Sequence, residues 1–259
     1  MTNPSAEFEK LHKTLRSQHS NIVNRALKLQ NDVVSPATTD PEQVWSIFWD
    51  KPLWAARKFE PIEKLVEEIG PETVGLWREW GQKVGTYQLC KSTEGRDKHV
   101  FLLDGEKTEL HPSISALRHY SIYGAARYLW RAQQREDRSQ ISPAFQPANL
   151  FKEAPRQKRK KIIKDLQISL GTGWGCITIL HLLTDFGVAA KPDRHVIRSL
   201  SHFDDGFSTN PTSAARAVDV WARVEKLLQT VNEGRPEEKR LSLRYFEKIL
   251  MAFSEQHLL

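Results

Sequence analysis

The chain has 259 residues, of which 39% are hydrophobic and 27% charged, so it can bury the core of one domain or of two closely packed helical lobes. This composition argues against a chain that is disordered over most of its length. No apolar run approaches the roughly twenty residues that a membrane span needs, and the N-terminus lacks an apolar signal core, so we expect a cytoplasmic protein without membrane contact.

The two cysteines, Cys90 and Cys176, lie far apart and form neither a CxxC pair nor a cluster with histidines. This spacing argues against a zinc site and against an iron–sulfur cluster. We therefore expect no metal at the functional site and a reducing, intracellular setting.

The positive charge of the chain is concentrated in one window. The formal net charge is +6, and residues 152–164 hold seven basic side chains against one acidic side chain. This window alone accounts for the excess, and the rest of the chain is balanced. Such a run favours an acidic partner, although a charge run by itself is usually a solvated helical face.

Helical spacing of apolar residues marks most of the first part of the chain. The predicted helical stretches cover residues 6–31, as one or two helices, residues 40–51, residues 60–70 and a stretch that begins at Pro71. In the last of these, Trp77 and Trp80 lie three residues apart on one face, and core packing is the preferred interpretation.

Residues 87–110 depart from the helical pattern, because Asp-Gly and Glu-Gly pairs stand between short apolar runs. This pattern predicts a small β-hairpin or an extended loop. Helical spacing resumes after Ser113 and predicts a central core helix.

Residues 133–150 are polar and contain two prolines, so they are predicted to connect two lobes. The candidate domains are an N-terminal helical lobe, residues 1–140, and a second lobe, residues 141–259, around a DNA-binding cleft. Alternatively, the two lobes interleave as one domain. The predicted fold is all-α, apart from the one hairpin, and its last helices are expected to begin at Asp193, near Ala214 and at Leu243.

A glycine-rich turn separates two helical stretches in the second lobe. Gly171, Thr172 and Gly173, with Gly175 close behind, predict a helix-hairpin-helix turn. Such a turn lets the backbone approach a phosphate, and the following helix offers free N–H groups to that anion. A tight loop without a ligand is the simpler interpretation, but the only strongly basic segment leads directly into this turn.

Contacts to a DNA backbone are therefore expected from the turn and from basic side chains beside it. The candidate residues are Gly171, Thr172, Gly173, Gly175, Arg156, Lys158, Arg159, Lys160, Lys161 and Arg194.

Asp193 follows a proline and opens a helix eighteen residues after Gly175. The simpler interpretation is a helix cap, which is worth about 1 kcal/mol. The functional interpretation is a carboxylate that stabilises the positive charge developing on a sugar and orients an attacking water. Trp174 would either pack under the turn or line a base pocket, and Tyr120 and Tyr123 are further pocket candidates.

The order of the hairpin glycines, an apolar helix and then Lys191-Pro192-Asp193 resembles the helix-hairpin-helix DNA glycosylase superfamily. The resemblance covers roughly residues 156–203. It implies a two-lobed helical fold, with hairpin roles for Gly171 and Gly173 and the catalytic role for Asp193. It also allows a monovalent cation on the hairpin carbonyls and otherwise implies no cofactor.

Three departures from the family pattern narrow the prediction. The residue before the first glycine is Leu170, whereas the family's typical hairpin has a proline before that glycine. The position of the strand-cleaving lysine falls near Trp174 or Gly175. There is no four-cysteine cluster either. The nearest resemblance is to alkyladenine-type or 8-oxoguanine-type enzymes without that lysine, which implies hydrolysis by water.

The resemblance thus implies a monomeric, monofunctional glycosylase that flips a modified base out of double-stranded DNA and leaves an abasic site, in repair or in defence against phage. The excised base would be alkylated, oxidised or hypermodified. Two alternatives stay open: a non-catalytic helix-hairpin-helix protein that binds DNA, and a helical scaffold whose basic run binds an acidic protein.

Overall fold

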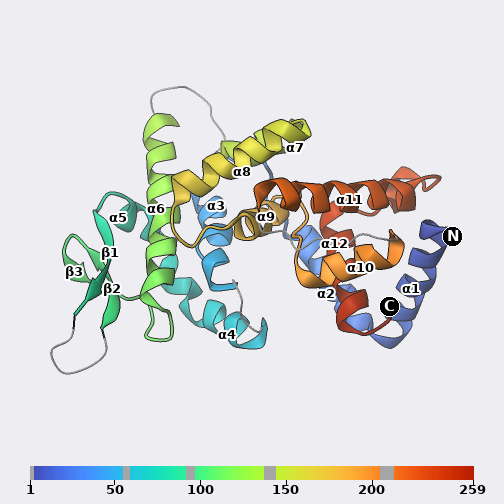
Figure 1. The fold of residues 1–259 in the computed structure, drawn as a ribbon, viewed down its shortest axis with the longest axis horizontal. Coiled ribbons are helices and arrows are strands. Elements are labelled where there is room, and N and C mark those ends of the chain that lie inside the picture. Colours follow the sequence, from blue (N-terminus) through green and yellow to red (C-terminus); the bar gives the residue numbers. More distant parts are fainter. Residues whose placement is uncertain (1–2, 55–58, 92–96, 137–143, 205–212) are drawn as a thin grey trace.

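Figure 1 shows the computed structural model, which describes residues 3–54, 59–91, 97–136, 144–204 and 213–259. Within these residues the chain forms twelve α-helices and one small antiparallel sheet. The expectation of a mostly helical fold with a small β element is confirmed. No helix in the described part of the chain is both long and apolar enough to cross a bilayer.

The two ends of the chain share one body. Helices α1 and α2 lie against α11 and α12, as Figure 1 shows at its right-hand side. The bounds of these helices are α1 (Pro4–Gln18), α2 (Ser20–Asn31), α11 (Ala214–Asn232) and α12 (Leu243–Glu255). Phe8 of α1 is fully buried, and its ring lies 5.0 Å from that of Phe246 in α12. Apolar burial thus joins the N-terminal residues to the C-terminal helices.

The helix predicted from Asp40 is confirmed as α3 (Pro41–Phe48), with the Asp40 side chain accepting a hydrogen bond from the Glu42 N–H. The 3₁₀ helix η1 (Lys51–Trp54) and α4 (Phe59–Ile69) follow.

The single helix predicted from Pro71 is wrong. A short 3₁₀ helix, η2 (Gly70–Thr73), is separated from α5 (Leu76–Gly81) by Gly75, whose φ of +75° interrupts a right-handed helix. Trp77 and Trp80 are buried, which confirms their packing role.

The predicted β-hairpin is confirmed as β1 (Gly85–Cys90) paired with β2 (Lys98–Leu103), with Tyr87 opposite Phe101. A third strand, β3 (Glu106–Lys107), was not predicted and pairs with β2 through a tight turn at Gly105, where φ is +87°.

Helix α6 (Ala116–Glu136) lies at the centre of this part of the fold. The sheet and α5 pack on one side of α6, and α3 and α8 contact it as well (Figure 1). The prediction of a central core helix is confirmed by Ile122, Ala126 and Leu129, which are at most 1% exposed.

The predicted connection over residues 133–150 is wrong in part, because α6 runs to Glu136 and α7 (Gln146–Glu153) begins inside it. Pro147 stands in the first turn of α7, where its missing N–H costs nothing, and Phe151 is fully buried. The proposed boundary near residue 140 lies outside the described residues.

The second half supplies α8 (Arg156–Leu170), α9 (Cys176–Asp185) and α10 (Arg194–Phe203), and the short 3₁₀ helix η3 (Glu237–Lys239) precedes α12. The predicted starts of α10, α11 and α12 are confirmed, and α12 extends to Glu255. The loop at residues 205–212 lies outside the described part.

Candidate nucleic-acid interface and active site

The glycine turn between α8 and α9 has the backbone that its sequence predicts. Gly171 and Gly173 have φ of +78° and +90°, a region that favours glycine. Ser121 of α6 holds the turn from below, because its hydroxyl donates to the Thr172 carbonyl at 2.9 Å. A Cβ on Gly173 would lie 1.9 Å from that hydroxyl oxygen. The glycine is therefore required by contact as well as by conformation.

Trp174 fixes the same turn to α6. Its indole N–H donates to the Ser121 carbonyl at 2.8 Å, and its side chain is 2% exposed. The ring packs edge-on to Phe48 with 5.1 Å between centroids. The structure thus places Trp174 under the turn, where it packs the hairpin onto the core.

Close approach of α6 to the end of α8 completes this support. A Cβ at Gly124 would lie 2.3 Å from the Leu170 carbonyl oxygen, so only glycine allows the two helices this contact. The turn is consequently held on α6 by two hydrogen bonds and by direct backbone contact.

The outer surface of the turn is open to solvent. Gly171, Thr172, Gly173 and Gly175 are all exposed. Gly175 is the N-cap residue of α9 and has no side chain with which to cap the first-turn amides. The glycine backbone of the turn and the N-terminus of α9 are therefore exposed, which is the arrangement that binding of a phosphate would require.

The basic residues of α8 divide into two groups. Arg156 and Lys160 lie against Asp219 of α11, with a Lys160 Nζ to Asp219 Oδ1 distance of 3.9 Å. Arg159 lies over the Trp221 ring, 3.9 Å from its centroid. These three side chains are engaged by α11, so they are less available to a partner than the sequence suggests.

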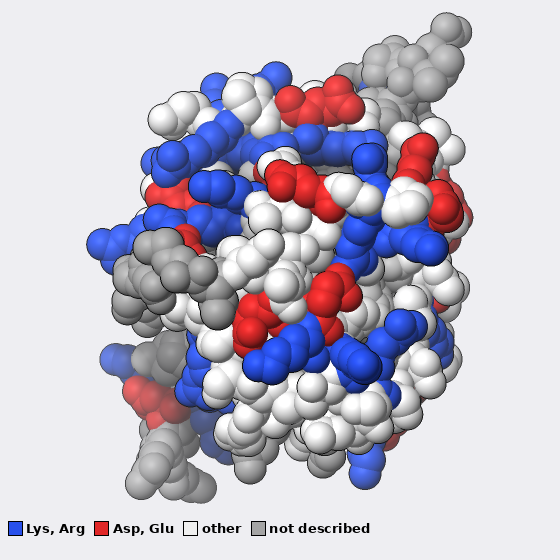
Figure 2. Space-filling model, turned by 90° about the vertical axis from the view of Figure 1, so that its right-hand side faces the viewer, with Lys and Arg blue, Asp and Glu red and all other residues white. Residues whose placement is uncertain are grey.

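Lys158, Lys161 and Lys164 form the second group and are exposed. Lys161 and Lys164 are three residues apart, so they share one face of α8. Figure 2 shows lysine and arginine gathered across the upper part of the molecule, at the height that α7, α8 and α11 occupy in Figure 1.

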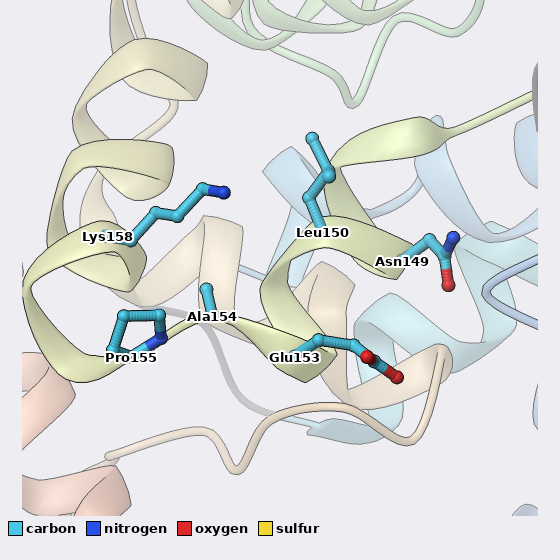
Figure 3. Close-up of a pocket in the computed structure, with 6 residues that line it drawn as sticks. All are labelled: Asn149, Leu150, Glu153, Ala154, Pro155 and Lys158. Atoms are coloured by element: carbon cyan, nitrogen blue, oxygen red, sulfur yellow. The ribbon is translucent and has the colours of Figure 1, made fainter.

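A surface pocket lies where α7 meets α8, as Figure 3 shows. It is lined by Asn149, Leu150, Glu153, Ala154, Pro155 and Lys158. Its one basic side chain, Lys158, is balanced by Glu153, and Asp193 does not line it.

Asp193 begins α10 and caps it. Its Oδ1 accepts hydrogen bonds from the His195 and Val196 N–H groups, both at 3.0 Å. The second oxygen, Oδ2, lies 4.0 Å from Lys191 Nζ, and the Asp193 side chain is 17% exposed. One oxygen is therefore occupied by the helix, while the other accepts no hydrogen bond from the residues that the structure describes, and the side chain is partly accessible. Arg194, the next residue, is exposed.

A cluster of charged residues lies behind this aspartate, and the sequence does not predict it. Lys51 of η1 contacts Asp50 at 2.9 Å and Asp185 of α9 at 2.6 Å. Burial disfavours the charged lysine, but the two carboxylates outweigh it and raise the pKa of Lys51. Burial raises the pKa of Asp50, against the effect of Lys51. The cluster joins residues that stand more than a hundred positions apart.

Helix α12 contributes the other half of the cluster. Arg244 contacts Asp185, and lies 3.3 Å from the Glu247 carboxylate. Lys248 lies 3.5 Å from the same carboxylate. The side chain of Glu247 is fully buried, so its charge is compensated only by these two cations among the described residues.

Lys191 connects Asp193 to this cluster. The His181 imidazole of α9 has a pKa well below its ordinary value because it is buried and because Lys191, Lys51 and further cations surround it. Its ring lies 6.4 Å from that of Trp54, in an edge-on arrangement. The Trp54 indole N–H also donates to Asp50 at 2.8 Å, so Trp54 belongs to this cluster, although the sequence analysis does not select it.

Tyr120 and Tyr123 lie on the side of α6 that faces the sheet. Their rings are 5.9 Å apart, and both contact Phe101 of β2. Ser121, between them, points to the glycine turn instead. The two tyrosines are therefore not brought together with Asp193.

Comparison with protein-family models, with curated proteins and with solved structures finds no match to this chain.

Proposed function

We propose that the protein is a monofunctional DNA glycosylase that hydrolyses the N-glycosidic bond of a modified base and leaves an abasic site. The observation that carries this proposal is the pairing of an exposed glycine turn, fixed from below by Trp174, with a partly exposed aspartate at the start of α10. The turn would hold the phosphate backbone without reading sequence.

The hydrogen bonds and the exposure of Asp193 support a catalytic role for its carboxylate. Breaking an N-glycosidic bond leaves positive charge on the sugar, and a fixed carboxylate oxygen stabilises that charge. Because Oδ1 is held by two backbone N–H groups, Oδ2 has a fixed position at 17% side-chain exposure. The same oxygen would orient the attacking water and accept its proton.

Hydrolysis is favoured over strand cleavage by the turn itself. Strand cleavage needs an amine that attacks the sugar, and the turn from Gly171 to Gly175 contains no lysine. The partner is then double-stranded DNA, with Lys158, Lys161 and Lys164 neutralising phosphates beside the turn.

A DNA-binding protein without catalytic activity is the second candidate. It is favoured by one observation, the two cap hydrogen bonds of Asp193, which by themselves explain an aspartate at this position. The two candidates differ in base release, because only the glycosylase frees a base from DNA.

The proposal is tested by incubating the protein with genomic DNAs that carry alkylated, oxidised or hypermodified bases. The supernatant is then analysed by mass spectrometry, and abasic sites are counted in the same DNA. A glycosylase releases one base for each abasic site formed. Binding of DNA without any released base, across all of these DNAs, supports the non-catalytic protein instead.

A further inference from the structure

The charged cluster behind Asp193 has an inner part in which cations and carboxylates are closely matched. Lys51 lies within 2.9 Å of both Asp50 and Asp185, and Arg244 contacts Asp185 and Glu247. Buried charges with partners at such distances are compensated where they stand. This part ties η1, α9 and α12 together.

The outer part of the cluster consists of Lys191 and Lys248, whose ammonium groups lie farther from their carboxylate partners. Lys248 shares the Glu247 carboxylate with Arg244 and lies 3.5 Å from it, while Lys191 has Asp193 at 4.0 Å. Burial lowers the pKa of Lys248, and the charges of Arg244 and Lys191 lower it further, against Glu247. Two ammonium groups thus stand near each other with weak pairing.

The two lysines of the outer part are partly exposed, as Asp193 is. The side chains of Lys191 and Lys248 are 20% and 17% exposed, close to the 17% of Asp193. His181 and Trp54 are half-buried next to them. Lys191 thus lies between the proposed catalytic carboxylate, 4.0 Å away, and a group that contains Lys248 and the neutral imidazole of His181.

We propose that Lys191 and Lys248 receive the departing base and stabilise the negative charge that it acquires, so that the enzyme selects neutral, oxygen-bearing bases over cationic alkylated ones. This inference rests on the proposed glycosylase function. Ammonium groups offer three N–H donors and no acceptor, so they fit carbonyl and hydroxyl oxygens and repel a cation.

Breaking the bond between the base and the sugar requires one proton transfer at the base and another at the attacking water. When the C1′–N bond of a neutral base breaks, its electron pair goes to the base, which takes a proton from a lysine ammonium. Water adds to C1′ and gives its proton to Asp193, and proton exchange with solvent restores both groups. A cationic base such as N7-methylguanine leaves neutral and needs no such donor.

The test compares release rates under single-turnover conditions from duplexes that contain 8-oxoguanine, 5-hydroxymethylcytosine or N7-methylguanine. The unmodified protein should release at least one of the two neutral bases faster than N7-methylguanine. In Lys248→Met that rate should fall about 100-fold, the size of a lost proton donor. Lys248→Arg, which keeps the charge and the hydrogen-bond donors but does not give up a proton, should recover only the part of the rate that charge stabilisation supplies.

Lys239→Met, at an exposed position of η3, is the matched control and should release bases at the unmodified rate. Thermal unfolding of each variant shows whether the fold is kept, and Lys191→Met supplies a second test should Lys248→Met fail to fold. Faster release of N7-methylguanine than of both neutral bases, or an unchanged rate in folded Lys248→Met, would overturn the inference and leave the glycosylase function standing. No release from any DNA would refute both.

Discussion

At the scale of single residues, the glycines of the turn differ in what they tolerate. Gly173 combines a φ of +90° with a would-be Cβ only 1.9 Å from Ser121 Oγ. Gly175 has a φ of −72° and nothing within 4 Å of its Cβ position. The fold thus requires glycine at position 173, whereas position 175 has room for a side chain.

Replacing these two glycines by alanine tests the support of the turn. We expect Gly173→Ala to lower the free energy of unfolding by roughly 1–3 kcal/mol, because strain and a steric clash add. Gly175→Ala should change it by less than about 0.5 kcal/mol. Urea denaturation of both variants measures the difference, and equal stabilities would contradict the described contact with Ser121.

Local backbone requirements are the part of the site that sequence predicts well. The turn at Gly171 and Gly173 and the cap at Asp193 each depend on a few neighbouring residues, and the structure has both. The cluster around Lys51 and Arg244 could not be predicted in this way, because its members come from three distant stretches. Nothing local in the sequence specifies that they meet.

At the scale of elements, α8 uses its positive charge on two faces. One face is engaged by α11, and Arg159 on this face also donates to the Phe151 and Lys152 carbonyls of α7 at 3.0 and 2.9 Å. The other face carries Lys161 and Lys164 to solvent. The sequence shows how much charge the helix has, but only packing shows which part of it a partner can reach.

Neutralising the exposed face should weaken DNA binding in a salt-dependent way. For Lys161→Gln combined with Lys164→Gln, we expect the slope of log K against log salt to become shallower by about 2, because two phosphate contacts are lost. The matched control is Lys13→Gln with Lys28→Gln, which removes the same charge from exposed positions of α1 and α2. Titrations of fluorescent DNA at several salt concentrations supply both slopes. If the control pair reduced the slope equally, DNA binding would depend on net charge alone and not on this face of α8.

Element boundaries were mispredicted where a short-range signal was ambiguous. Pro147 suggested a connection, yet a proline in the first turn begins α7 as readily as it ends a helix. Gly75 stands inside a helical pattern of apolar residues and divides η2 from α5. Burial of Phe151 favours helix in α7, whereas the φ of +75° at Gly75 interrupts the helical pattern there.

At the scale of the whole molecule, two buried histidines form hydrogen bonds in their neutral form, and one of them, His12, joins opposite ends of the chain. His12 of α1 lies 2.8 Å from the Tyr245 hydroxyl of α12, and His119 of α6 accepts from the Leu110 N–H at 2.9 Å. Burial lowers the pKa of each imidazole to about 4. Protonation would place an uncompensated charge inside the fold.

These histidines make the stability depend on pH. Between pH 6.5 and 4 the unfolded chain binds protons that the folded chain does not, so the free energy of unfolding falls as the pH falls. Over this whole pH range, each histidine lowers the free energy of unfolding by an amount on the order of 3 kcal/mol. His12→Phe should remove its share of this dependence when urea unfolding is repeated at pH 7 and 4.5. A variant whose stability falls as steeply as that of the unmodified protein would contradict the neutral state of His12.

The long-range arrangement is also where the sequence predicts least. Helical periodicity identifies most of the helices, but the packing of α1 and α2 against α12 brings together residues from opposite ends of the chain. The pattern of apolar residues within a helix shows which face is buried and leaves its partner undetermined. The mostly helical fold could be predicted for this reason, whereas the arrangement of its helices could not.

The most direct test of the glycosylase function is the rate of base release by Asp193→Asn, measured in a single turnover on the DNA that the unmodified protein processes best. Asparagine caps a helix as well as aspartate does, so stability and DNA affinity should be kept. Asp40→Asn makes the same change at the cap of α3 and is the control. We predict that Asp193→Asn loses release by about 1000-fold or more while Asp40→Asn keeps the full rate. Full activity of Asp193→Asn would contradict the catalytic role of Asp193.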